Sequence, residues 1–140
     1  METLNKTWFI DIDGTFIKHL SNMTLDELMA LQDSYKLEEP LKDSVQFMNN
    51  IPEKDTIVIT TARESRHKEH TLKMLEHFNI RYDKILFDLR SGPRVLVNDI
   101  KPVGVVGNES PIKTAYAINV ERDRGISIDR HENILHLMEG

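Results

Sequence analysis

The chain contains no cysteine among its 140 residues. This absence excludes disulfide bonds, thiolate catalysis and thiolate metal sites. The sequence also lacks a basic excess, because its formal net charge is -5 and the charged residues are spread along the chain. A non-specific nucleic-acid binder needs a basic face, so we expect no binding of that kind. No apolar run approaches the length that crosses a bilayer, and we therefore expect no membrane contact.

The first residues are polar and acidic, without the basic segment and apolar stretch of a signal peptide. We therefore expect a cytoplasmic protein. A chain of 140 residues can bury the core of one domain but not of two. The sequence predicts a single domain over residues 1–140.

Two carboxylates follow the first apolar run of the chain. Trp8–Ile12 is apolar, aromatic and β-branched, which predicts a buried strand, and Gly14 lets the backbone turn away after it. Asp11 and Asp13 are two residues apart, so their side chains point to the same side of an extended chain. Such carboxylates repel each other unless a cation or a shared proton relieves them, and they suit Mg²⁺. One can act as a nucleophile while the other moves a proton.

The run Asp11-Ile12-Asp13-Gly14-Thr15 resembles the first motif of the haloacid dehalogenase-like (HAD) superfamily, Asp-x-Asp-Gly-Thr. The resemblance implies that Asp11 is the nucleophile, forming an aspartyl-phosphate, and that Asp13 is the general acid/base. Both would contact Mg²⁺, Asp13 through its backbone carbonyl. An Asp at position 13 is typical of the family's phosphatases rather than its dehalogenases. The implied fold is α/β, a three-layer α/β/α Rossmann-like domain with a mainly parallel sheet. The alternative is an Asp-Gly turn that only ends a strand.

A second apolar strand, Thr56–Arg63, ends in hydroxyl groups and precedes a predicted helix at Glu64–Phe78. This strand end resembles the second HAD motif, in which a hydroxyl donates a hydrogen bond to a phosphoryl oxygen. The resemblance implies this role for Thr60, with Thr61 as the nearby alternative and substrate contact. A helix N-terminus beside it would attract an anion. Arg63 either contacts the phosphate or the substrate body, or is a solvated residue at the helix start.

Two polar residues, Asn98 and Asp99, directly follow the predicted strand Val95–Val97. This strand end resembles the fourth HAD motif, which delivers an acidic residue to the metal. The resemblance implies that Asp99 binds Mg²⁺ together with Asp11. Asn98 departs from the usual Asp or Gly of the motif, although its carbonyl oxygen can still bind Mg²⁺ or a metal-bound water.

The basic residue of the third HAD motif has three candidates. Arg90 follows the predicted strand Ile85–Phe87 and should lie near the carboxyl rim of the sheet, so we predict that it is catalytic. Lys84 precedes that strand, and Arg94 begins the next one, which places both at the opposite end. Lys101 is a further basic group near the predicted rim, and we expect it to contact the substrate.

Residues 18–39 are too few for a separate cap domain of the kind that many HAD proteins insert here. The sequence predicts two short helices in this insert, the first with Thr24 as N-cap and Glu27 completing a capping box. A minimal cap leaves the site open, able to accept a bulky substrate or to use a partner or second subunit as a lid.

The remaining predicted elements are a helix at Leu41–Ile51, a strand at Thr114–Val120 and a helix within 121–140. His131 and His136 are five residues apart, one too many for the zinc motif His-Glu-x-x-His. His67 and His70 lack a third ligand. We expect nearly all of these histidines at the surface.

The ordered series of motifs predicts a Mg²⁺-dependent phosphatase that hydrolyses a small phosphomonoester. Two alternatives remain open at this point. One is a non-catalytic HAD-fold module that binds phosphate or a partner. The other is a phosphotransferase whose acceptor is not water.

Overall fold

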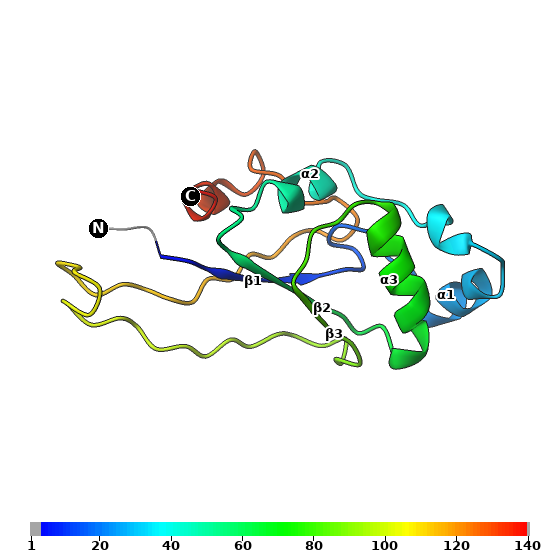
Figure 1. Ribbon diagram of the computed structural model, residues 1–140, viewed down its shortest axis with the longest axis horizontal. Helices are drawn as coiled ribbons and strands as arrows, with labels where there is room; N and C mark the ends of the chain where they lie inside the picture. The colour runs from blue at the N-terminus through cyan, green and yellow to red at the C-terminus, as the bar shows by residue number, and fades with distance from the viewer. Residues whose placement is uncertain (1–3, 140) are drawn as a thin grey trace.

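The structure, a computed structural model, describes residues 4–139. It has an α/β fold built on a parallel three-stranded sheet in the order β1-β2-β3 (Figure 1). The strands are β1 (Thr7–Asp11), β2 (Thr56–Thr60) and β3 (Lys84–Leu86). Because all three run in parallel, their carboxyl ends share one edge of the sheet, where Asp11 pairs with Thr60 and Thr60 with Leu86.

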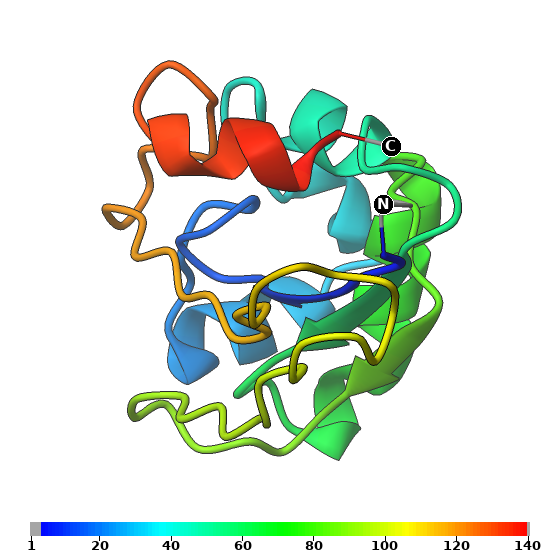
Figure 2. The same ribbon diagram turned by 90° about the vertical axis from the view of Figure 1, so that its left-hand side faces the viewer.

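Short helices connect and cover the strands. They are α1 (Asn22–Met29), η1 (Ser34–Leu37), α2 (Ser44–Asn49), η2 (Ser65–His67), α3 (Lys68–His77) and η3 (Glu132–Leu137). Figure 2 shows α2 and η3 on one side of β1, with much of the extended chain after β3 on the other. Within residues 4–139, none of the helices is long and apolar enough to cross a bilayer.

The core lies between the sheet and these helices. β-Branched residues of the strands, including Ile10, Ile57 and Ile59, are buried against Met48 of α2 and Met74 of α3. Burial of such side chains is the main favourable term in folding. The predicted strands 8–12 and 85–87 form within about one residue of their expected positions. The predicted strand 56–63 begins where expected, but β2 ends at Thr60, before the predicted end at Arg63.

Two helix starts differ from the prediction. Ser21, not Thr24, caps α1, because the Ser21 hydroxyl accepts a hydrogen bond from the Thr24 amide at 3.1 Å. The predicted helix Leu41–Ile51 is shorter, since Asp43 has a left-handed backbone with φ 64° and α2 begins only after it.

The predicted strands Val95–Val97 and Thr114–Val120 were wrong. Both segments are extended but outside the sheet, and Val95 and Val97 are 85% and 89% exposed. The link after β3 is too short for the helical crossover that a further parallel strand requires. The chain instead runs away from the sheet and doubles back, with an antiparallel bridge between Lys101 and Ile112 (Figure 1).

Candidate functional site

A tight turn after β1 presents the two acidic residues. The backbone amides of residues 15–17 all donate hydrogen bonds to the Ile12 carbonyl, at 3.1–3.2 Å. Gly14 makes this turn possible because it adopts φ +82°, which few other residues reach without strain. The turn begins where β1 ends, so Asp11 and Asp13 lie at the carboxyl edge of the sheet. Open α/β sheets place their sites at this edge.

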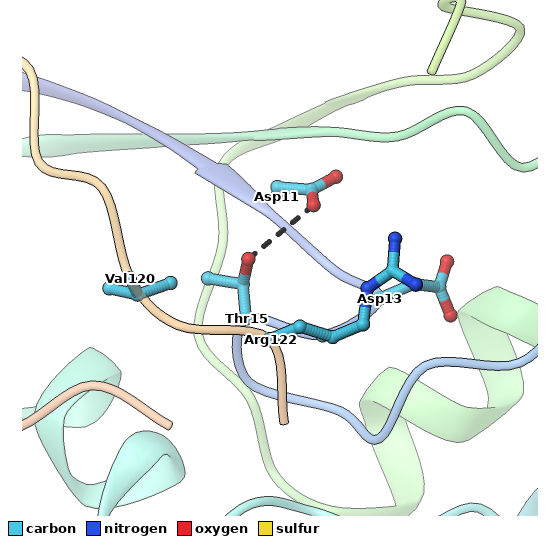
Figure 3. A pocket seen from close by; sticks show the side chains of 6 residues that line it. Asp11, Asp13, Thr15, Val120 and Arg122 are labelled. Atoms are coloured by element: carbon cyan, nitrogen blue, oxygen red, sulfur yellow. Dashed lines mark hydrogen bonds between the residues drawn. The ribbon is translucent and has the colours of Figure 1, made fainter. Parts of the chain in front are cut away.

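An open pocket of about 190 Å³ lies at this turn. Its lining residues are Asp11, Asp13, Gly14, Thr15, Val120 and Arg122. Figure 3 shows the hydrogen bond from the Thr15 hydroxyl to the Asp11 carboxylate, which is 3.4 Å long, and the Arg122 side chain extending toward Asp13. The structure thus brings both predicted carboxylates into one cavity with a cation.

Sequence reasoning missed Val120 and Arg122 as site residues. They are two residues apart in an extended segment, so they share one face of it. The Asp123 amide holds this segment against the turn by donating to the Gly14 carbonyl at 2.9 Å. The one sequence signal was a basic residue just beyond an apolar run, which is too common to identify a site.

The pKa of Asp11 is raised above its usual value of 3.8. Burial is the largest cause, and repulsion from the Asp13 carboxylate adds to it. The Ile12 amide, the charge of Arg94 and the Thr15 hydroxyl act in the opposite direction. Asp11 therefore stands where added positive charge would favour its ionised form.

The two threonines at the end of β2 have different surroundings. Thr60 pairs with Asp11 across the sheet, so the two residues lie side by side at the carboxyl ends of β1 and β2. Thr61 is fully buried, and its hydroxyl accepts a hydrogen bond from the Arg63 amide at 3.0 Å. The Thr61 hydroxyl thus stabilises the turn out of the strand.

Arg63 is 2% exposed, and its guanidinium lies between two carboxylates. It bonds Asp13 through Nε at 3.0 Å and Nη2 at 2.8 Å, and Glu38 through Nη1 at 2.9 Å and Nη2 at 2.5 Å. Such fork-shaped pairs are stronger and more directional than single hydrogen bonds. Glu38 was not predicted as a site residue, because nothing distinguishes one glutamate in a polar insert.

The prediction that His67 and His70 lie at the surface was wrong. His67 is fully buried and its Nε2 lies 2.9 Å from Asp26, while His70 is 9% exposed and its Nε2 lies 2.9 Å from Glu38. Residues three apart share a helix face, and here that face meets the insert of residues 18–39. The two histidines therefore fasten the insert to η2 and α3.

Of the eight predicted site residues, only Asp11 and Asp13 line the pocket. The other six do not, namely Thr60, Thr61, Arg63, Arg90, Asp99 and Lys101. Asp99 and Arg90 are exposed, and the Asp99 carbonyl accepts a hydrogen bond from the Thr114 hydroxyl. Lys101 belongs to the antiparallel bridge with Ile112. The predicted positions of Asp99 and Lys101 depended on the predicted strand 95–97, which would have carried both to the carboxyl edge, whereas Arg90 follows β3, which does form. Among the described residues, no three Asp, Glu or His side chains lie close enough together to hold a metal ion.

The Glu38 contacts predict how stability depends on pH. Burial alone raises the pKa of Glu38, yet the hydrogen bonds from His70 and Arg63 outweigh it and hold the pKa below 4.5. A lowered carboxyl pKa adds stability above the unfolded-state pKa, and this is lost as pH falls through the folded-state value. We expect the free energy of unfolding, measured in urea, to fall as pH drops below about 4.5.

Two variants isolate this effect. Glu38→Gln should be less stable at neutral pH and should lose less stability on acidification, since its titrating group is gone. Glu39→Gln is the control, because that neighbour is exposed and its carboxylate pairs with the exposed Lys18 at 3.6 Å. Equal acid sensitivity of Glu38→Gln and the wild type would contradict the assignment.

Comparisons with known proteins add no further evidence on the site. No family model matches the chain, and neither the curated proteins nor the solved structures contain a match.

Proposed function

We propose that this chain is a Mg²⁺-dependent phosphatase for a small phosphomonoester, with Asp11 as nucleophile and Asp13 as general acid/base. The observation that carries the proposal is the shared open pocket of Asp11, Asp13, Thr15 and Arg122 at the carboxyl end of a parallel sheet. The proposal includes a single HAD-like domain with a three-layer fold, in which residues 18–39 take the place of a cap.

In the proposed reaction, the Asp11 carboxylate attacks phosphorus as the bond to the leaving oxygen breaks. Asp13 donates a proton to that oxygen, and the product alcohol departs. Asp13 then takes a proton from water, whose oxygen attacks the aspartyl-phosphate. Inorganic phosphate leaves and the Asp11 carboxylate is restored. The raised pKa of Asp11 matters because only its ionised form is a nucleophile.

The second requirement of this chemistry is a set of cations that balance the negative charge of the phosphoryl oxygens. Arg122 lines the pocket, and the charge of Arg94 reaches Asp11. We therefore assign the charge-balancing role to these two arginines. Thr60, beside Asp11, is the proposed hydroxyl donor. The roles of Arg90 and Lys101 stay predictions from the sequence alone.

The carboxylates of the pocket fit Mg²⁺ in their chemistry. Mg²⁺ is commonly held by one or two carboxylates, with waters and substrate phosphate oxygens completing the shell. Asp11 and Asp13 would hold it here, and the bound ion would neutralise charge on the phosphoryl group. Asp99 as a further ligand remains a prediction, since it lies on the exposed segment after β3.

A phosphate- or partner-binding module is the second candidate function. The observation that favours it is the absence of a three-ligand acidic or histidine cluster in residues 4–139. The open pocket also leaves room for a partner surface to act as a lid. Transfer to an acceptor other than water uses the same first step and differs only in its product.

The test is hydrolysis of an aryl phosphate and of a phosphomonoester panel with Mg²⁺. We expect turnover that EDTA abolishes and added Mg²⁺ restores. The melting temperature should stay nearly unchanged, because the hydrogen bonds of Asp13 with Arg63 and of Asp11 with Thr15 form without the ion. Full activity in EDTA would contradict the metal requirement. No turnover on any ester, together with phosphate binding, would favour the binding module. A phosphorylated product formed with added alcohols or sugars would indicate phosphotransfer.

A further inference from the structure

We infer that Arg63 is a positioning residue, which orients the Asp13 carboxylate and couples it through Glu38 to the insert of residues 18–39. The inference rests on the proposed function in one respect, the role of Asp13 as acid/base. It replaces the substrate contact that the sequence predicted for Arg63.

The hydrogen bonds that Arg63 makes within the protein leave none of its N–H donors for a substrate. A guanidinium has five N–H donors. In the described structure Arg63 makes five side-chain hydrogen bonds, two to Asp13, two to Glu38 and one from Nη1 to the Thr71 hydroxyl at 3.2 Å. It is 2% exposed and is not one of the residues that line the pocket. Its contribution to catalysis must pass through Asp13.

The pair with Asp13 fixes one rotamer of the acid/base group. Nε and Nη2 bind the two Asp13 oxygens separately, so the plane of the carboxylate is set by the plane of the guanidinium. The Asp13 side chain nevertheless stays 20% exposed, which leaves it accessible to a substrate in the pocket.

The pair with Glu38 ties the same arginine to the insert. Glu38 directly follows η1, is 4% exposed, and also bonds His70 of α3 at 2.9 Å. The Tyr35 ring packs edge-on against the His70 ring, with centroids 6.5 Å apart. The packing of the insert against α3 and the orientation of Asp13 therefore both depend on the buried guanidinium of Arg63.

The kinetic test is Arg63→Lys, which keeps the charge but cannot bind two oxygens in a plane. With p-nitrophenyl phosphate we expect kcat to fall about 10- to 100-fold with KM nearly unchanged, since misplacement of a catalytic group by about 1 Å has effects of this size. This substrate needs little help from an acid to expel its leaving group, so Asp13 matters chiefly for hydrolysis of the aspartyl-phosphate. The phosphorylated enzyme should therefore accumulate in the variant, measured by acid quench.

Arg66→Lys is the matched control. Arg66 also pairs with the insert, at 3.0 Å from Asp26, but its side chain is 52% exposed and has no bond to Asp13. We expect wild-type kcat and no accumulation of phosphoenzyme. A raised KM with unchanged kcat in Arg63→Lys would instead make Arg63 a substrate ligand. Unchanged kinetics in Arg63→Lys would also overturn the inference.

A second measurement does not depend on activity. In a double-mutant cycle of Asp13→Asn and Glu38→Gln, the losses in unfolding free energy should be non-additive, because both carboxylates share Arg63. Additive losses would overturn the coupling. A wild type without phosphatase activity would contradict the proposed function alone, and the cycle would still decide whether Arg63 links Asp13 to the insert.

Discussion

Asp11→Asn should lower turnover of an aryl phosphate by at least about 10³-fold, the scale of effect seen when a nucleophile is removed. An amide cannot attack phosphorus as a carboxylate does, so no aspartyl-phosphate should form. The side chains are nearly equal in size, and the hydrogen bond from Thr15 can still be accepted by the amide oxygen. Steady-state rates and acid-quench detection of phosphoprotein provide the measurement.

The control for this substitution is Asp33→Asn. Asp33 is exposed, lies outside the pocket and has a left-handed backbone with φ 55°, which asparagine tolerates as well as aspartate. Its turnover should equal that of the wild type. Unchanged turnover in Asp11→Asn would contradict the covalent mechanism, whatever the behaviour of Asp13.

Gly125→Ala should cost about 2–4 kcal/mol of unfolding free energy, from left-handed strain and overpacking together. Gly125 has φ +76°, and a Cβ there would lie 2.7 Å from both the Lys42 carbonyl and the Ser44 hydroxyl. The Ser44 hydroxyl also accepts a hydrogen bond from the Ile126 amide at 2.8 Å, which seats this segment. Moving the segment would carry Arg122 away from the pocket, so turnover should fall as well.

Gly107→Ala separates strain from crowding. Gly107 has the same φ of +76°, but a Cβ there would meet nothing within 4 Å. We expect a loss of only about 1–2 kcal/mol from the left-handed backbone. Urea denaturation of both variants gives the comparison. Equal losses would show that the contacts of Gly125 with residues 42–44 do not hold the C-terminal segment.

Local sequence signals were sufficient for the first half of the fold. The buried strands at 8–12 and 56–60 follow from unbroken apolar and β-branched runs, which have one favourable placement in a parallel sheet. The turn at Gly14 follows from its conformational freedom. The same reasoning failed for 95–97, where an equally apolar run lies exposed. Strand pairing depends on whether a connection can reach the sheet, which an apolar pattern does not encode.

The acidic pair of the site could likewise be identified from sequence, because Asp11 and Asp13 follow directly on a predicted strand. Their positive partners could not. Arg94 was placed at the wrong end of the sheet by a strand that does not form, whereas in the structure its charge acts on Asp11. Arg122 reaches the pocket only because residues near the C-terminus fold back onto the Gly14 turn.

The sequence by itself therefore determined the parallel sheet and the carboxylates at its edge, since both arise from residues adjacent in the chain. The tertiary structure alone decided what surrounds those carboxylates. Arg63 meets Asp13 across 50 residues and Glu38 across 25. Contacts at such separations depend on how the insert packs on α3. A buried charged group is stable only when all of its ionic and hydrogen-bonding partners are in place.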